Sequence, residues 1–448
     1  MGIHIPGGWP SLTAMSVLSN APTSTKLENR TMGARQTPQK KRKRTPSLSD
    51  AIAKKLKERR DASLQLLGAN VRRRKAEHEV SAGSLRFNPR KVKVEEAPKE
   101  TAIAKAPVLQ DPSALRSSPK AAHSDESSAE DVIRPPATEI ETYEELRLLG
   151  DSSYGRVYLI QSNKTHQLFA TKKFKDKAKS LSESGFPREV RMLRAIQHVG
   201  THVNVVRFHE AAISCSGDVS MRLEYCNGGD LHGQVRRFRE MGIRAPVQFA
   251  LHAFIQLCEG LAFLHAGLRY DGEGGYQVEA RFDGGYVHND LKPENVFLRR
   301  GPRNEYGLPD LVLGDFSHTS PVSKPCKYVV GTPRWFSPEA RAMYHGQPQF
   351  PGQLITYKHD IYGLGLTLYN LLWDAYWPIG CDPRRLRVPE EHRDLGFEMV
   401  LQLMLQPFPF RRPGLTEGVL NLVESARELR QEAFEMEGSL AEKMWKTV

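Results

Sequence analysis

The pattern of apolar and polar positions divides the chain into two parts near residue 140. From Tyr143 onward, short runs in which apolar and polar residues alternate are followed by longer runs in which apolar residues recur at helical spacing. This order predicts an α+β domain in which strands come first and helices follow. In the preceding part, Lys and Arg residues surround apolar positions with near-helical spacing, which predicts a basic amphipathic helix over about residues 50–80. Its apolar positions are Ile52, Leu56, Leu64, Leu67 and Val71.

Charge is distributed as unevenly as the apolar residues. Residues 1–135 contain 26 Lys and Arg against 14 Asp and Glu, whereas the rest of the chain contains 38 of each, so the net charge of +12 lies in the N-terminal third. That third has two aromatic residues, Trp9 and Phe87, and no cysteine. It cannot bury enough apolar surface to offset the entropy lost on folding, so we expect residues 1–138, including a Pro- and Ser-rich linker, to be disordered.

The cysteines and the apolar runs argue against a disulfide-rich, zinc-binding or membrane-spanning protein. The five cysteines are widely spaced and form no C-x-x-C pair, which fits a reducing compartment and argues against a zinc or disulfide framework. No apolar run approaches the roughly 18 residues of a membrane span, and no basic residue opens a signal peptide at the N-terminus. We therefore expect no association with a membrane.

The N-terminal segment contains two dense basic clusters, Lys40–Arg44 and Arg72–Lys75. Such clusters are typical of nuclear-import signals, so we expect an import receptor to bind Lys40–Arg44 and the protein to lie in the nucleus, or in both nucleus and cytoplasm. The alternative is a solvated run of charge that binds nothing specific. Since few aromatic side chains are available to stack on bases, any contact with nucleic acid is expected to be a weak, salt-sensitive attraction to phosphates.

Several motifs in the second part of the chain indicate phosphate chemistry. Gly150–Val157 (GDSSYGRV) is a glycine-rich turn between two expected strands, where small residues let backbone N–H groups approach phosphate oxygens. Lys172 follows on a strand-like run, and Glu189 lies 17 residues later in a helical stretch. The remaining motifs are His288–Asn295 (HNDLKPEN), Gly314–Ser317 (GDFS), Gly331–Pro333 (GTP) and Ser337–Glu339 (SPE).

In order and spacing, these motifs resemble those of the eukaryotic protein kinase family. The resemblance covers residues 143–430 and implies a bilobal fold, with a small β-rich N-lobe and a larger helical C-lobe, followed by a C-terminal tail over 431–448. Phosphoryl transfer needs mainly positioning and charge neutralisation, which lysine, carboxylate and amide groups provide. The resemblance therefore implies ATP as the phosphoryl donor, Mg²⁺ as the cofactor and proteins as the substrates.

The resemblance also implies a role for each matching residue. Asp290 would orient the substrate hydroxyl or accept its proton, while Lys172, paired with Glu189, would hold the α- and β-phosphates of ATP. The implied catalytic residues are Asp290, Lys292, Lys172 and Glu189, and the implied magnesium ligands are Asn295 and Asp315. The implied ATP-binding residues are Gly150, Ser152, Gly155, Val157, Ala170, Lys172, Leu223, Glu224, Cys226 and Asp230.

Two subfamilies share features with the chain. The DLKPEN sequence and Gly331–Pro333 resemble serine/threonine kinases rather than tyrosine kinases. The runs Glu224–Leu231 (EYCNGGDL) and Asn295–Leu298 (NVFL) are similar to those of NIMA-related cell-cycle kinases. The residues at two positions, Asn289 and His318, are similar to those of Wee-type kinases, which modify tyrosine. A NIMA-like serine/threonine kinase and a Wee-type kinase with tyrosine or dual specificity therefore both remain open.

Three residues depart from the family pattern. Ser152 replaces the middle glycine of the phosphate-binding turn, Ser317 replaces the last glycine of the metal loop, and Asn289 replaces an arginine that grips a phosphorylated activation segment. We expect weaker nucleotide binding from the first, a stiffer metal loop from the second and little switching by phosphate from the third. The alternative function is a nuclear pseudokinase scaffold in which the basic segment binds the partner.

Overall fold

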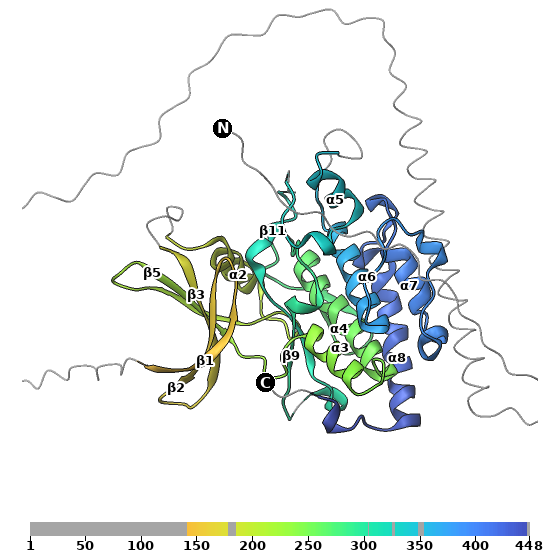
Figure 1. Ribbon diagram of the computed structural model, residues 1–448, viewed down its shortest axis with the longest axis horizontal. Coiled ribbons are helices and arrows are strands. Elements are labelled where there is room, and N and C mark those ends of the chain that lie inside the picture. The colour runs from red at the N-terminus through yellow and green to blue at the C-terminus, as the bar shows by residue number, and fades with distance from the viewer. Residues whose placement is uncertain (1–140, 178–184, 303, 325–327, 348–353, 446–448) are drawn as a thin grey trace, which may run out of the picture. The chain divides into compact units, whose positions relative to one another are not determined.

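The computed structural model describes residues 141–177, 185–302, 304–324, 328–347 and 354–445. They form two lobes, a β-sheet with one helix beside it and a larger assembly that is mostly helical (Figure 1). The predicted bilobal α+β fold is confirmed. The segment 1–138, with its basic clusters and its predicted helix, lies outside the described residues.

The smaller lobe is built on a five-stranded antiparallel sheet in the order β1-β2-β3-β5-β4. β-branched and aromatic residues favour these strands, and the glycine-rich turn joins the first two. In the register of the sheet, Lys172 lies between Val157 and Met221 of the neighbouring strands. The strands are β1 (Tyr143–Asp151), β2 (Gly155–Ser162), β3 (Leu168–Lys177), β4 (Phe208–Ile213) and β5 (Asp218–Glu224).

Helix α2 (Arg188–Val199) belongs to the smaller lobe and carries Glu189 in its first turn. It begins directly after Pro187, and an acidic residue in the first turn is favoured by the helix dipole. Its buried positions recur at the spacing of a single helical face, so the helix packs with one side against the core. These positions are Glu189, Val190, Leu193, Ile196 and Val199.

The larger lobe surrounds α4, whose residues Gln248 to Leu264 are all buried. In the part of the chain that the structure describes, α4 alone is long and apolar enough to cross a membrane, but 89% of its most apolar window is buried inside the protein. It is therefore the core helix of this lobe. The helices are α3 (Leu231–Glu240), α4 (Val247–Ala266), α5 (Pro338–Tyr344), α6 (Lys358–Trp373), α7 (Phe397–Met404) and α8 (Leu420–Glu437).

Three short antiparallel strand pairs complete the larger lobe, and two of them hold the predicted catalytic motifs. The pair β9–β10 lies between Asn295 and Asp315, and the pair β8–β11 connects the segment before His288 to the segment after His318. The strands are β6 (Leu268–Tyr270), β7 (Tyr276–Val278), β8 (Tyr286–Val287), β9 (Val296–Arg299), β10 (Asp310–Leu313) and β11 (Ser320–Pro321).

The structure corrects the boundary predicted at residue 430. Helix α8 continues to Glu437, Arg430 and Ala433 are buried within it, and Trp445 is buried beyond its end. Residues 431–445 therefore belong to the helical lobe and do not form a separate tail. The predicted start near Tyr143 coincides with the first residue of β1.

Candidate active site

Lys172 of β3 and Glu189 of α2 form a buried ion pair. The Nζ atom of Lys172 lies 2.6 Å from Oε2 of Glu189, and both side chains are less than one-tenth exposed. Burial alone lowers the pKa of Lys172, but the charges of Glu189 and Asp315 outweigh burial, so this pKa lies above its usual value. The lysine is therefore charged at neutral pH, and the predicted pairing of strand and helix is present in the structure.

Asp315 lies on the other side of Lys172, with Oδ1 3.8 Å from Nζ. Its backbone has a φ of 57°, and its carboxylate accepts a hydrogen bond from the N–H of Ser317 at 3.4 Å. Burial alone raises the pKa of Asp315, but the charge of Lys172, the hydrogen bond from Ser317 and the charge of His288 together outweigh burial, so this pKa lies below its usual value. Ser317 itself lies in a 3₁₀ turn, Phe316–His318, where serine needs no positive φ. Replacing the family's glycine by Ser317 therefore introduces no backbone strain.

Asp290 lies on the catalytic loop, His288–Asn295, and its carboxylate is almost fully enclosed. Oδ2 accepts hydrogen bonds from Nζ of Lys292 at 2.7 Å and from Nδ2 of Asn295 at 3.1 Å, and Oδ1 accepts one from the N–H of Thr332 at 2.8 Å. Burial alone raises the pKa of Asp290, but the hydrogen bond and charge of Lys292 lead the contributions that lower it below its usual value. The group is therefore an ionised carboxylate at neutral pH.

Thr332 has a larger part in the site than the sequence indicated. Its hydroxyl accepts a hydrogen bond from Nζ of Lys292 at 2.6 Å, so backbone and side chain both contact the catalytic pair. The close approach requires Gly331, because an added Cβ would lie 2.6 Å from the carbonyl oxygen of Asn289 and φ at this position is 104°. The Gly-Thr-Pro motif, Gly331–Pro333, was the signal available in the sequence, but the position of this motif along the chain does not reveal the contact with Lys292.

Asp360 of α6 holds the backbone of the catalytic loop. Its carboxylate accepts hydrogen bonds from the N–H of His288 at 2.7 Å and of Asn289 at 2.9 Å, and Nε2 of His265 lies 2.9 Å away. Burial alone raises the pKa of Asp360, but the hydrogen bond and charge of His265, together with the charges of His288 and His359, outweigh burial and lower it. Phe316 packs against His288 with ring centroids 5.1 Å apart, which supports the loop from the side of the metal motif.

The phosphate-binding turn accommodates Ser152 by turning its hydroxyl onto the turn itself. Oγ of Ser152 donates to the carbonyl of Gly155 at 3.0 Å and accepts from the N–H of Gly155 at 3.3 Å. Gly150 has nothing within 4 Å of where a Cβ would lie, so the start of the turn is open. A glycine at position 152 would leave the turn more flexible, whereas the hydroxyl of Ser152 holds the turn in one conformation by its hydrogen bonds with Gly155.

The implied ATP-binding residues after β3 lie at the end of β5 and in the hinge, residues 225–230, that follows it. Leu223 is opposite Ala170 in the sheet. The carboxylate of Glu224 pairs with Arg299 at 2.7 Å. Cys226 packs against the core, and burial raises the pKa of its thiol. Each of these side chains therefore has a structural contact of its own, so a nucleotide bound beside them would meet mainly the backbone groups of the hinge.

Asp230, one of the implied ATP-binding residues, caps the N-terminus of α3. Its Oδ1 accepts a hydrogen bond from the N–H of Gly233 at 2.7 Å. This is the arrangement expected for an N-cap aspartate. Asp230 is therefore positioned by α3, so a shift of this helix would also displace the carboxylate.

The donor set near Asp290 fits Mg²⁺ that is bound together with phosphates. Among the described residues, no group of three or more His, Cys, Asp or Glu could hold a metal ion. Mg²⁺ commonly takes one or two carboxylates and completes its shell with waters and substrate phosphate oxygens. Asp315 offers a carboxylate, and Asn295 offers its amide oxygen because its amide nitrogen faces Asp290. The segments of these two donors are joined by a hydrogen bond from Gly314 N–H to Asn295 O at 2.9 Å.

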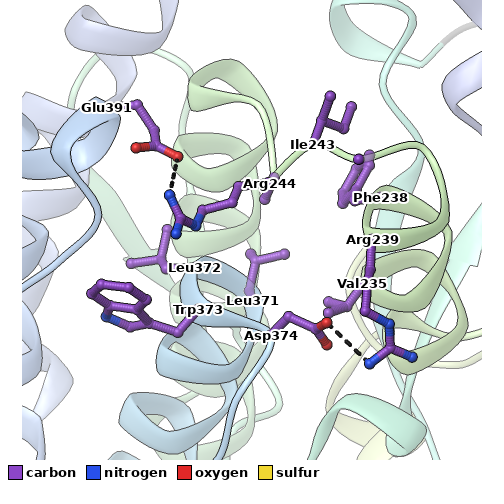
Figure 2. A pocket seen from close by; sticks show the side chains of 12 residues that line it. Val235, Phe238, Arg239, Ile243, Arg244, Leu371, Leu372, Trp373, Asp374 and Glu391 are labelled. Atoms are coloured by element: carbon purple, nitrogen blue, oxygen red, sulfur yellow. Dashed lines mark hydrogen bonds and ion pairs between the residues drawn. The ribbon is translucent and has the colours of Figure 1, made fainter. Parts of the chain in front are cut away.

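A cavity of about 680 Å³ lies elsewhere in the helical lobe, between the C-terminal ends of α3 and α6 (Figure 2). Its walls combine apolar side chains, such as Phe238 and Trp373, with charged ones. Two ion pairs lie at its sides, one between Arg239 and Asp374 at 3.1 Å and one between Arg244 and Glu391 at 3.1 Å. None of the predicted site residues lines this cavity.

Comparison with known proteins agrees with this geometry. A family model described as "Protein kinase domain" matches residues 143–378, more than half of the chain, and the chain belongs to the protein kinase family. The predicted family membership is confirmed.

Several curated relatives are serine/threonine kinases. Mouse "Serine/threonine-protein kinase Nek3" is 28% identical over 236 residues, which are 52% of this chain and 38% of the mouse protein. Human "Serine/threonine-protein kinase Nek2" is 29% identical over 238 residues, 52% of this chain and 46% of the human protein. Arabidopsis thaliana "Serine/threonine-protein kinase SRK2J" is 30% identical over 256 residues, 55% of this chain and 62% of that protein. The chain thus spans less than two thirds of each relative, and the predicted resemblance to NIMA-related kinases is confirmed at this low identity.

Proposed function

We propose that the protein is a kinase that transfers the γ-phosphoryl group of ATP to serine or threonine hydroxyls of other proteins, with Mg²⁺ as cofactor. The observation that carries this proposal is the ion pair of Lys172 with Glu189 at 2.6 Å, with Asp315 on its other side. A phosphoryl-transfer site needs its cations and carboxylates in place before the nucleotide binds, because reorganisation during the reaction is costly. Here they are in place and held by buried contacts.

The residues of the catalytic loop divide the work of the transfer. Asp290, ionised at neutral pH, orients the substrate hydroxyl and is positioned to accept its proton. Lys292 balances charge on the γ-phosphoryl group and is held in place by Asp290 and Thr332. Lys172 fixes the α- and β-phosphates. When bound, Mg²⁺ would neutralise negative charge on the phosphates, with Asp315 and Asn295 as its protein ligands.

Serine/threonine specificity is favoured over tyrosine specificity by the same contacts. Lys292 donates a hydrogen bond of 2.6 Å to the hydroxyl of Thr332 beside Asp290. The segment Gly331–Pro333 therefore lies close to where the substrate hydroxyl would bind. A short hydroxyl side chain suits such close approach better than a phenol. The proposal extends to a NIMA-like role in nuclear or cell-cycle signalling, with a Wee-type specificity or a catalytically inactive scaffold as the alternatives.

The test of this specificity is transfer of labelled phosphate from ATP to peptide mixtures, followed by separation of the phosphoamino acids. The proposal expects label on serine and threonine. Label on tyrosine alone would favour the Wee-type alternative, and nucleotide binding without any transfer would favour the scaffold.

We also propose that Lys40–Arg44 binds a nuclear-import receptor and directs the protein to the nucleus. The support is the run of five consecutive cations in a segment of low apolar content. Any contact of the segment with nucleic acid is proposed to be weak and salt-sensitive, because it would rest on phosphate attraction.

A further inference from the structure

The residues after α8 form a strap across helix α3. We use "strap" for residues 438–445, which begin where Gly438 ends α8 with a φ of 74°. Two side chains of α3 hold its backbone: Nε2 of Gln234 donates to the carbonyl of Met444 at 2.7 Å, and Nε of Arg237 donates to the same carbonyl at 3.2 Å. Because Gln234 is buried, this contact is shielded from water and fixes the strap against the helix.

Trp445 anchors the end of the strap in an aromatic cluster. Its ring lies 5.1 Å from that of Phe249 in α4 and 6.2 Å from that of Phe238 in α3, and it is 6% exposed. The rings of Phe238 and Phe249 are themselves 5.6 Å apart. Trp445 therefore joins α3 to the core helix of the lobe.

The contacts of α3 on the side of the cavity in Figure 2 are weaker. There Phe238 faces the cavity, and Arg239 pairs with Asp374 beyond the end of α6. The side chain of Arg239 is 60% exposed, and an ion pair this open to solvent contributes little. The strap, in contrast, contacts α3 through the buried side chains of Gln234 and Phe238. Among the described residues, it therefore holds α3 more firmly than the ion pair beside the cavity does.

The strap also reaches the hinge through Arg300. Asn227 of the hinge donates from Nδ2 to the carbonyl of Arg300 at 3.2 Å and accepts at Oδ1 from the N–H of Arg300 at 2.8 Å. The guanidinium of Arg300 pairs with Glu442 of the strap at 3.0 Å, but because the Glu442 side chain is 87% exposed this pair is also weak, and the strap is held mainly by its buried contacts with α3. One residue therefore contacts the hinge with its backbone and the strap with its side chain.

We propose that the strap positions the hinge and the first turn of α3 for nucleotide binding, so that Trp445 is a positioning residue for ATP although it does not contact it. This inference rests on the proposed function. The carboxylate of Asp230 is bound to the first turn of α3, and the side chain of Asn227 in the hinge is bound to the backbone of Arg300. Loosening the strap frees α3, which carries the first of these contacts, and removes the pair of Glu442 with Arg300 beside the second. Asp290 and Lys292 keep their own contacts on the catalytic loop.

The test compares Trp445→Ala with Trp445→Phe and with Lys443→Ala in the full chain. Lys443 is exposed and contacts α3 through its carbonyl, so its truncation is a matched control. We expect Trp445→Ala to weaken binding of a fluorescent ADP analogue roughly three- to tenfold, the range typical of coupling through packed elements. The KM for ATP should rise by the same factor, while the KM for peptide and kcat change little. Trp445→Phe should restore most of the affinity, and Lys443→Ala should leave it unchanged.

Hydrogen exchange without nucleotide separates this inference from the proposed function. Trp445→Ala should speed exchange in residues 226–240 and leave α6 protected. Unchanged exchange there, or unchanged nucleotide affinity, would overturn the inference even if the enzyme is active. Should Trp445→Ala fail to fold, Arg237→Ala removes hydrogen bonds to the strap without emptying a core position, and the same two readouts apply. A wild-type protein that binds no nucleotide would overturn the proposed function, and with it the role of the strap in binding.

Discussion

Asn289 donates a hydrogen bond from its side-chain amide to the buried hydroxyl of Ser320 at 2.9 Å. The same amide group donates to the carbonyl of His318 at 3.0 Å and to that of Val287 at 3.1 Å. Asn289 has a φ of 67°, a conformation that asparagine tolerates better than most residues. The catalytic loop is therefore joined to the start of the activation segment, the stretch between Asp315 and Glu339, by neutral hydrogen bonds that need no phosphate.

Activity should consequently be independent of phosphate on the activation segment. We expect Asn289→Ala to lower kcat about tenfold, equivalent to about 1.4 kcal/mol, because the segment loses its tie to the catalytic loop. Ser323→Ala, at an exposed position of the same segment, should have little effect. Steady-state kinetics before and after phosphatase treatment check the account. A tenfold loss on dephosphorylation would show that another cation performs the role of the missing arginine.

Lys172 and Lys173 are adjacent on β3 but face opposite sides of the sheet, which makes them a matched pair. Lys172 is buried beside Glu189, whereas Lys173 is about half exposed and pairs with Glu145 at the surface. Lys172→Met should reduce turnover by roughly 10²- to 10⁴-fold, because the phosphates lose their positioning charge and Glu189 is left buried without a partner. Lys173→Met should leave turnover little changed. Equal effects of the two substitutions in kinetic assays would contradict the assignment of Lys172.

The pair of Glu339 and Arg412 gives a stability that depends on pH. Arg412 donates two hydrogen bonds of 2.6 Å to the carboxylate, and both side chains are buried. Burial alone raises the pKa of Glu339, but Arg412 outweighs burial and lowers it below the usual 4.5. A carboxyl whose pKa is lower in the folded state stabilises the fold fully above its unfolded pKa and loses this contribution as the pH falls through the folded pKa.

Glu339→Gln should therefore lower the free energy of unfolding by about 3–5 kcal/mol at pH 7, since Arg412 is left buried without a counter-charge. Denaturant titrations at several pH values measure this difference, which should shrink as the pH falls below 4.5. Glu145→Gln is the control, because its pair with Lys173 is exposed and such pairs contribute little. A difference for Glu339→Gln that grows toward low pH would contradict the lowered pKa.

Replacing Lys40–Arg44 with five alanines should move a fluorescent fusion of the full chain out of the nucleus, because import receptors bind clustered cations. The control replaces Arg72–Lys75 in the same way. An unchanged distribution of the first variant would remove Lys40–Arg44 as the signal. A shift in the control alone would assign import to Arg72–Lys75.

The sequence was enough to predict those site residues for which the chemistry of phosphoryl transfer requires both a particular residue type and a particular order along the chain. A lysine on β3 must reach a glutamate on α2, and Asp290, Asn295 and Asp315 must meet around phosphates, so residue type and order along the chain are enough to assign them. The burial of β3 and α2 then follows from ordinary strand and helix patterns.

Other features depend on contacts between residues far apart in the sequence, and spacing does not reveal these. The boundary at residue 430 was wrong because the kinase motifs stop before α8 ends, while Trp445 is held by residues of α3 and α4 about 200 positions earlier. The effect of Ser317 could be judged only from the backbone conformation, because Asp315 and not Ser317 takes the positive φ. The role of Thr332 depends on the loop conformation that Gly331 permits.

Phosphoryl transfer by this site is tested most directly by comparing wild type with Asp290→Asn in the full chain. Label transfer from Mg·ATP to peptide and binding of the nucleotide are measured on the same preparations. Both proteins should bind nucleotide with similar affinity, and the variant should transfer about 10²- to 10⁴-fold more slowly, because it lacks only the group that orients the hydroxyl. A wild-type protein that binds nucleotide and transfers no more label than Asp290→Asn would contradict the claim.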